Sequence, residues 1–172
     1  MADPYPARGY WFPGSPTTSQ ARAALETASA YFRRDDSEMP VVELPDDSAL
    51  WFDRIDGRCI EFSMSGIDLL RVNTLADIVT SERIILRFLR ALIERGAAFA
   101  YISAIREEYI WEAYCAIDEA MLDWTPADAL PVSIITSSDV VCMWQASLAA
   151  DMNPSYIWDG VAVLQPAPFR LN

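Results

Sequence analysis

The chain has 172 residues, of which 52% are hydrophobic and 22% charged, a composition typical of a single folded domain whose core needs no disulfide or metal. Its formal net charge of −12 disfavours direct binding of nucleic acid or of anionic membranes, and favours a basic protein partner. The chain contains no histidine and no lysine, which excludes Ser-His-Asp and Cys-His catalysis, the common zinc sites and Schiff-base chemistry.

The N-terminal segment, residues 1–16, combines four prolines with several aromatic side chains. Prolines keep a segment extended, and aromatic rings gain by covering a surface. We therefore expect a strap that lies on the domain, with a partner-binding arm as the alternative. Strap and remainder are expected to form one domain over residues 1–172. The alanine-rich run at residues 18–34 then predicts the first helix.

The strongest β signal is a hairpin within residues 49–65, whose two strands flank Asp56-Gly57. Asp-Gly between two strands predicts a two-residue type I′ turn. On the second strand apolar side chains alternate with polar ones, so one face is expected to meet the core and the other water. Shorter strands are expected at residues 41–44 and 67–72.

Residues 81–96 predict the helix around which the core is built, with a start as early as Leu75 and an end at Gly96. Its apolar side chains cover more than half of the circumference, and arginines occupy the narrow polar strip that remains. The apolar run at residues 97–104 predicts an interior strand covered on both faces. The expected core residues are Ile84, Ile85, Phe88, Leu89, Leu92, Phe99, Tyr101, Ile110 and Ile117.

A second strong helix is predicted at residues 107–123, and it carries the candidate binding surface. The candidate partner-binding residues are Glu108, Trp111, Glu112, Glu119 and Asp123. At 100° per residue the four carboxylates share about 60° of the circumference, with the tryptophan beside them. An aromatic side chain flanked by carboxylates is typical of an interface for a basic partner.

Two other interpretations of this acidic strip remain open. In the first, Arg83, Arg87 and Arg90 of the preceding helix face the strip and neutralise it within the protein. In the second, the strip is solvated and binds nothing. Charge reversal of the strip separates these interpretations, because the reversal would destabilise the fold if the strip is paired within the protein.

The C-terminal third predicts shorter elements. A strand is expected at residues 132–136, a moderate helix at residues 137–148, and a hairpin around Asp159-Gly160. Taken with the earlier elements, this order predicts an α+β fold. We expect a mixed or mainly antiparallel sheet with an N-terminal β-meander, packed against about four helices.

The three cysteines, Cys59, Cys115 and Cys142, are odd in number and widely spaced, as expected of reduced and mostly buried thiols. We expect no enzymatic activity, no metal and no cofactor. The first 19 residues lack the charged start and apolar core of a secretory signal, and the apolar runs are too short to cross a bilayer. These features predict a cytoplasmic protein.

A small, acidic, tryptophan-rich α+β domain without a catalytic motif is similar to immunity proteins of bacterial polymorphic and secreted toxin systems. The residues that carry this likeness are Trp51, Phe52, Glu108, Trp111, Glu112 and Glu119. The resemblance implies a protein that binds a toxin domain in the producing cell and occludes its active site. The alternatives are an inhibitor from a mobile element whose carboxylates imitate nucleic-acid phosphates, and a small enzyme that uses Asp, Glu, Tyr or Cys.

Overall fold

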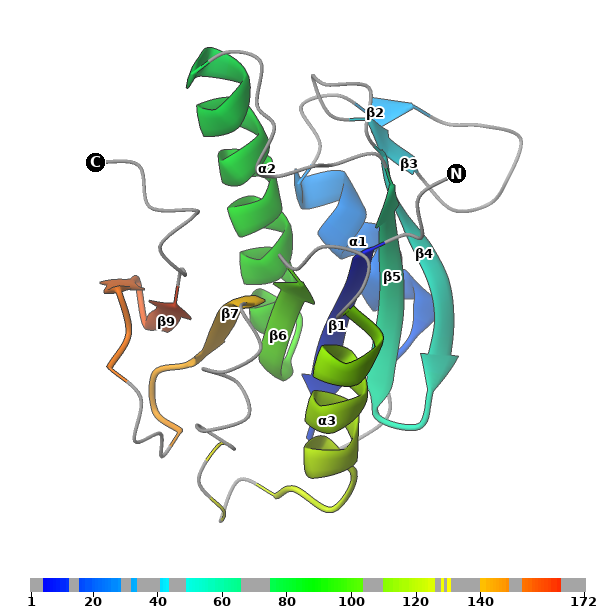
Figure 1. Ribbon diagram of the computed structural model, residues 1–172, viewed down its shortest axis with the longest axis vertical. Helices are drawn as coiled ribbons and strands as arrows, with labels where there is room; N and C mark the ends of the chain where they lie inside the picture. Colours follow the sequence, from blue (N-terminus) through cyan, green and yellow to red (C-terminus); the bar gives the residue numbers. More distant parts are fainter. Residues whose placement is uncertain are drawn as a thin grey trace.

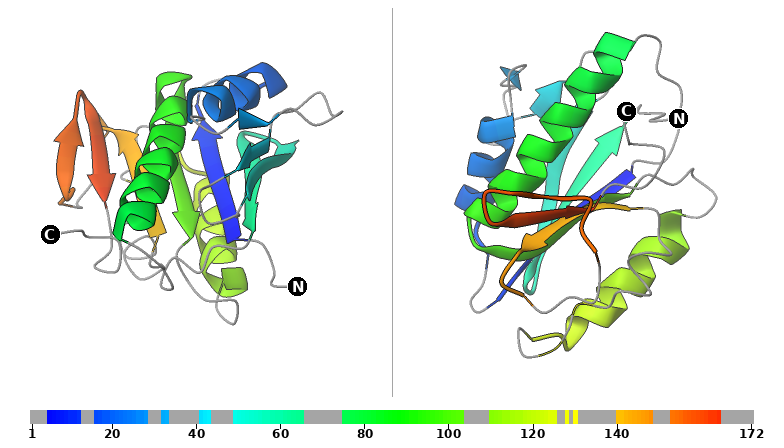
Figure 2. Two further views of the ribbon diagram at one scale, coloured as in Figure 1. Left: turned by 90° about the horizontal axis from the view of Figure 1, so that it is seen from above. Right: turned by 90° about the vertical axis from the view of Figure 1, so that its left-hand side faces the viewer.

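The described part of the chain forms an antiparallel sheet with helices on both faces (Figure 1). Residues 5–12, 16–28, 32–33, 41–43, 49–65, 75–103, 110–125, 128, 130, 140–148 and 153–164 are described by the computed structural model. The right-hand view of Figure 2 shows α3 on one side of the sheet and α1 and α2 on the other. The predicted α+β class is confirmed.

Nine strands and three helices make up the described residues. The strands are β1 (Tyr5–Trp11), β2 (Phe32–Arg33), β3 (Val41–Glu43), β4 (Ala49–Asp56), β5 (Cys59–Ser65), β6 (Ala97–Ser103), β7 (Val140–Gln145), β8 (Tyr156–Trp158) and β9 (Val161–Leu164). The helices are α1 (Thr18–Ala28), α2 (Leu75–Glu94) and α3 (Ile110–Leu122). The strand order is β2-β3-β4-β5-β1-β6-β7-β9-β8, and the described part has three helices where about four were expected.

The N-terminal segment differs from the expected strap, because Tyr5–Trp11 is the strand β1 between β5 and β6. A small residue in β1 allows close packing against this central strand. A Cβ added to Gly9 would lie 2.8 Å from the ring of Trp11, so only glycine lets this ring lie so close to the strand. Tyr10 and Trp11 therefore belong to the core, and Phe12 packs against it.

The predicted hairpin is present, but its turn is shifted by one residue. Asp56 pairs with Cys59, so the two turn residues are Gly57 and Arg58, and Gly57 has a φ of 58°. A type I′ turn needs positive φ at both central residues, so the expected turn type is wrong. A bulge between Phe52 and Arg54 adds a residue to β4, so the register beside the turn differs by one residue from the register farther along the hairpin.

The central helix and the interior strand agree with the prediction. Helix α2 starts at Leu75, and Gly96 follows its end with a φ of 109°. Strand β6 is buried on both faces along residues 97–102. Every predicted core residue whose side chain is described is buried, while the side chain of Ile110 lies outside the described residues.

Two further predicted segments require correction, and two others are confirmed. The first helix ends at Ala28, and the chain re-enters the sheet as β2 within the range expected to be helical. Val140–Gln145 is a strand, β7, in the range where a helix was expected, because its side chains alternate between two buried faces. The strand at residues 41–44 is confirmed as β3. The last hairpin is also confirmed, with positive φ at Asp159 and Gly160.

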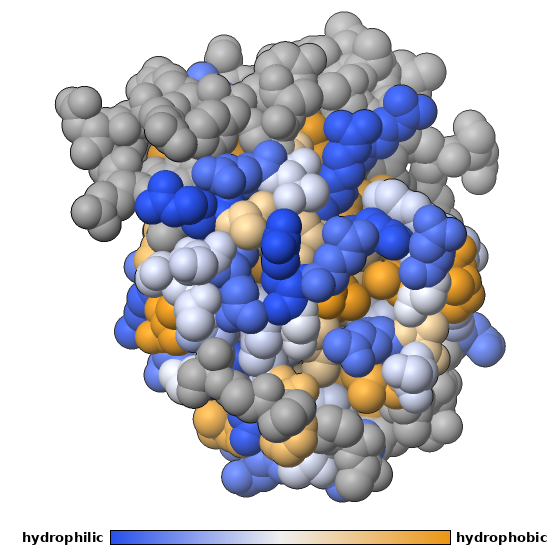
Figure 3. Space-filling model, turned by 180° about the vertical axis from the view of Figure 1, so that it is seen from behind, coloured by the Kyte–Doolittle hydropathy of each residue, from blue (hydrophilic) through white to orange (hydrophobic). Residues whose placement is uncertain are grey.

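Two predicted strands, at residues 67–72 and 132–136, lie outside the described residues. None of the described helices is long and apolar enough to span a membrane. The face of the sheet that carries α1 and α2 has hydrophilic and hydrophobic residues interspersed over its coloured surface (Figure 3).

Candidate functional site

A cleft of about 290 Å³ lies between helix α3 and the turn that joins β4 to β5. It is lined by Tyr10, Asp56, Gly57, Arg58, Cys59, Glu61, Asp118, Met121 and Leu122. Three of these residues are carboxylates, and the apolar part of the lining comes mainly from α3 and the Tyr10 ring. Side chains from three strands and one helix therefore converge on this cleft.

Beside the cleft, a buried arginine holds two of the carboxylates. Arg8 is 7% exposed, and its Nη2 lies 3.4 Å from Oε1 of Glu61, while its Nε lies 3.3 Å from Oδ2 of Asp118. The Tyr10 hydroxyl donates to Oδ1 of Asp118, and Arg54 donates to Glu61 from the solvent side. The buried charge is thus paired and hydrogen-bonded, as a buried ion must be.

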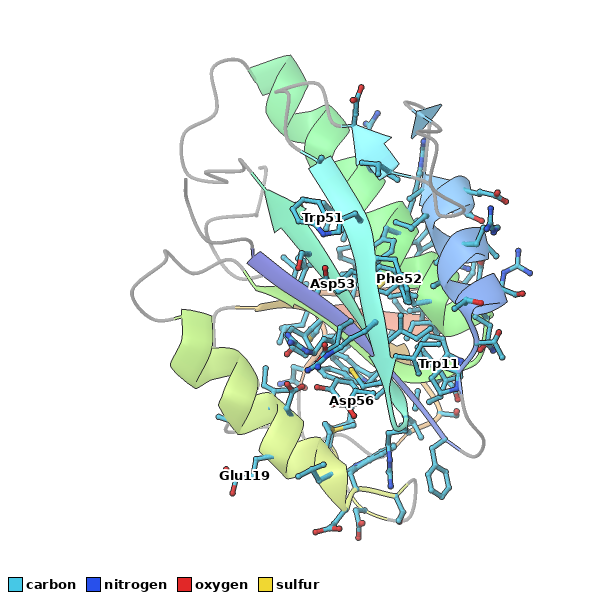
Figure 4. The ribbon with its side chains drawn as sticks, turned by 90° about the vertical axis from the view of Figure 1, so that its right-hand side faces the viewer. Trp11, Trp51, Phe52, Asp53, Asp56 and Glu119 are labelled. Atoms are coloured by element: carbon cyan, nitrogen blue, oxygen red, sulfur yellow. The ribbon has the colours of Figure 1, made fainter. Side chains whose placement is uncertain are left out.

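The sheet register brings these groups together. Arg8 and Tyr10 alternate with small residues on β1, so both point to the α3 face, and Arg8 pairs directly with Glu61 of β5. The bulge in β4 then turns Arg54 to the same face, where it also pairs with Glu61. Figure 4 shows Trp51 and Asp53 of β4 on the α3 side and Phe52 on the α1 side.

Burial changes the ionisation of the aspartate at the cleft. It raises the pKa of Asp118 to about 6, although the neighbouring Arg8 guanidinium lowers it. Burial also lowers the pKa of Arg8, but nearby charges, those of Asp118 and Glu61 among them, raise it by more, so Arg8 remains a cation. The carboxyl of Asp118 can therefore gain or lose a proton close to neutral pH.

The other polar groups of the cleft are less suited to chemistry. Glu61 is 12% exposed and is held by two arginines, so it cannot easily act as a base. Burial raises the pKa of the Cys59 thiol to about 12, and a protonated thiol is a poor nucleophile. Among the described residues, no group of histidine, cysteine or carboxylate side chains could hold a metal ion.

The predicted partner-binding residues are placed in part. Glu119 and Asp123 are exposed at the C-terminal end of α3, and Figure 4 shows Glu119 pointing away from the sheet. Trp111 and Glu112 belong to α3, but their side chains lie outside the described residues, as does the whole of Glu108. The structure therefore places two carboxylates of the strip and leaves the other three positions as predictions.

Pairing of the strip with the arginines of α2 does not occur where both are described. Helices α2 and α3 lie on opposite faces of the sheet (Figure 2). Arg90 instead bonds to Glu94 at 2.9 Å and lies 4.4 Å from the ring centroid of Trp158. Arg83 and Arg87 are exposed. Pairing with these arginines is therefore wrong for Glu119 and Asp123, whereas Glu108 and the side chain of Glu112 lie outside the described residues.

The sequence prediction missed the most buried part of the site. Arg8 and Tyr10 were assigned to the strap, and Asp118 was left out of the acidic strip because it lies about 100° away from Glu119 on the helix. A usable signal was present, since Asp118 and Leu122 are four residues apart and so lie on one side of α3. The long-range pairing with Arg8 had no sequence signal.

A scan against protein-family models and searches of the curated proteins and of the solved structures each found no match to this chain.

Proposed function

We propose that this chain binds and neutralises a basic protein partner, as an immunity protein that inhibits a cognate bacterial toxin. The binding surface in this proposal consists of the cleft, the β4–β5 turn and the exposed end of α3 with Glu119, Leu122 and Asp123. We name this set the cleft surface. The site of contact and the immunity role are expectations that follow from charge and composition.

The observation that carries the proposal is the mixed lining of the cleft. Asp56, Glu61 and Asp118 bring carboxylates to a concave surface that Arg58 also lines and to which Met121 and Leu122 contribute apolar walls. Leu122 is 68% exposed, more than Tyr156 and Ile157, which are large hydrophobic residues that are also exposed. Apolar contact area next to complementary charge is what a specific interface requires.

The net charge of −12 supports the same partner class. Exposed carboxylates at Glu119 and Asp123 would attract a basic surface over roughly a Debye length, about 8–10 Å at physiological salt. This long-range attraction speeds association, whereas the apolar contacts slow dissociation. The proposal therefore predicts an inhibitor whose association rate falls as salt rises.

The proposal predicts that a toxin domain is encoded beside this chain in its genome, and the experiment is coexpression of the two in bacteria. Wild type is expected to restore growth, and Glu119→Arg together with Leu122→Asp is expected to abolish protection. Glu26→Arg on α1 is the control for the Glu119→Arg reversal, because Glu26 is exposed on the opposite face and both reversals replace one carboxylate by a guanidinium. Equal protection by the double variant, with an intact fold, would contradict this binding surface.

A further inference from the structure

Two arginines on the outer surface of α2 have no ion pair within the described part of the chain. Arg83 and Arg87 are both exposed and lie four residues apart, on one side of the helix. No carboxylate stands three or four residues from either of them, whereas Arg90 has Glu94 at that spacing and bonds to it at 2.9 Å. Like charges at this spacing repel each other, so the pair has a cost and no compensating contact among the described residues.

The composition of the chain makes these unpaired cations unusual. The chain has 25 acidic residues and 13 arginines, so carboxylates are available in excess. Three other arginines, Arg8, Arg54 and Arg90, each bond to at least one carboxylate. A cationic pair left open on the surface of an acidic protein is suited to an anionic partner surface.

The end of α3 carries the complementary pattern. Glu119 and Asp123 are exposed, lie four residues apart and have no ion pair among the residues that the structure describes. A leucine lies beside each charged pair: Leu122, 68% exposed, beside the carboxylates, and the half-buried Leu86 beside the arginines. We name Arg83, Leu86 and Arg87 the α2 patch, and Glu119, Leu122 and Asp123 the α3 patch. The two patches have the same spacing and opposite charge.

These patches cannot meet within one molecule, because α2 and α3 lie on opposite faces of the sheet (Figure 2). A second copy of the chain can supply the missing surface. The shared spacing of four residues corresponds to about 6 Å along a helix, so both ion pairs can form together. Leu86 and Leu122 then cover each other, which adds the apolar contact that surface ion pairs alone do not provide.

From this complementarity we propose that copies of this chain associate head to tail, through the α2 patch of one copy and the α3 patch of the next. Such an interface joins two different surfaces, so every assembly that does not close into a ring keeps one open patch of each kind at its ends. Nucleic acid would not supply the leucine contact, and the net charge of −12 repels its phosphates.

The net charge also opposes association between two copies, which makes the expected affinity low. This repulsion is spread over the whole surface and is screened beyond about 8–10 Å at physiological salt, whereas the patches meet in direct contact. The inference does not depend on the proposed function. Because the α3 patch belongs to the cleft surface, however, a second copy and a basic partner would compete for it.

The first test is sedimentation equilibrium of the full-length protein at physiological salt, at concentrations from about 0.02 to 0.5 mM. We expect an average mass that rises above 19.3 kDa with concentration, with a Kd of about 0.1–1 mM for so small an interface. An average mass that stays at that of one copy over the whole range would overturn the proposal.

Charge reversal then tests which surfaces meet. Arg83→Glu with Arg87→Glu, and Glu119→Arg with Asp123→Arg, should each weaken association at least about tenfold. An equimolar mixture of the two variants should regain it, because each reversed patch then meets a reversed patch of the other variant. A mixture that stays monomeric would contradict the pairing of these two patches.

The variant with all four reversals is the control for net charge, because its two gained and two lost carboxylates leave the charge at −12. It is expected to associate as wild type does, and failure to do so would also overturn the proposal. Glu26→Arg on α1 is the control for Glu119→Arg alone: both remove one exposed carboxylate, and only the second should weaken association.

The fold of each variant is checked by a urea melt, and it should be intact because all four side chains are exposed. If a reversal variant does not fold, Arg87→Gln replaces it. This variant removes one charge and is expected to weaken association about threefold, and unchanged association would contradict the proposal.

The coexpression assay separates this inference from the proposed function. The Arg83→Glu, Arg87→Glu variant keeps the cleft surface, so it should protect cells as wild type does. If wild type protects cells but does not self-associate, this inference fails and the immunity role stands. If wild type self-associates through the two patches but gives no protection, the head-to-tail interface stands and the immunity role fails.

Discussion

The two faces of β1 differ although they belong to the same strand. Toward α2 it presents Ala7 and Gly9, and toward α3 it presents Arg8 and Tyr10. On the first face small residues let the helix approach the strand, and packing density decides the stability. On the second face each polar group needs a partner, and the groups that supply them come from α3 and β5.

This difference teaches where stability is located and where, in our proposal, the partner binds. The α2 face contributes a core of apolar side chains in direct contact, such as the edge-to-face pair of Phe62 and Phe88 with ring centroids 4.7 Å apart. The α3 face combines stacked aromatic rings, Tyr10 and Tyr101 among them, with buried charge and an open cleft. Substitutions on the two faces should therefore have different signatures.

The largest expected effect is on the α2 face. Phe88→Ala should lower the free energy of unfolding by about 3–5 kcal/mol, because the ring is fully buried and packs edge-to-face against Phe62 of β5. A urea melt measures this loss, with Leu122→Ala as an exposed control. A loss below about 1 kcal/mol would show that this face does not carry the stability.

The next effect is on the α3 face. Arg8→Met removes the buried cation and leaves Glu61 and Asp118 beside a neutral side chain, so we expect a loss of about 3 kcal/mol at pH 7.5. At pH 5 the loss should be smaller, because Asp118 then carries a proton. Urea melts at both pH values test this. An equal loss at the two pH values would show that the charge of the Asp118 carboxyl does not change between them.

A smaller effect follows from Asp118 itself. Its pKa in the folded protein is about 6, above the ordinary value of 3.8, so the folded state holds the proton more tightly than the unfolded state. The resulting stability is present below pH 3.8 and is lost as pH rises through about 6. Asp118→Asn does not titrate, so relative to wild type it should gain about 1–2 kcal/mol between pH 4 and pH 7.5, after allowance for the exposed part of the carboxyl.

Urea melts of wild type and Asp118→Asn across this pH range measure the gain. A difference in stability that stays constant at every pH would show that burial does not raise the pKa of this carboxyl.

The smallest effect is expected at the exposed end of α3. Reversing Glu119 and Asp123 to arginine should change the free energy of unfolding by less than about 0.5 kcal/mol, because both carboxylates are exposed and lie on the same side of the helix. A urea melt of the double variant measures this. Unfolding at clearly lower urea than wild type would show that the strip is part of the folded architecture after all.

Local patterns in the sequence were enough for the strongest elements. The apolar surface of α2, the β6 run and the two Gly-containing hairpin turns identify themselves by periodicity and turn chemistry, which act over a few residues. Boundaries were less certain. The first turn lies one residue later than predicted, and β4 contains a bulge, which depends on pairing with the neighbouring strand and not on the local sequence alone.

Tertiary structure decided what the sequence could not. The place of Tyr5–Trp11 in the middle of the sheet follows from strand pairing over long distances, since β1 lies between β5 and β6. The pairing of Arg8 with Glu61 and Asp118 joins residues 53 and 110 positions apart. Such contacts depend on register and on which face each helix covers. The sequence by itself therefore determined the strongest elements and the charge of the protein, while the fold determined the cleft.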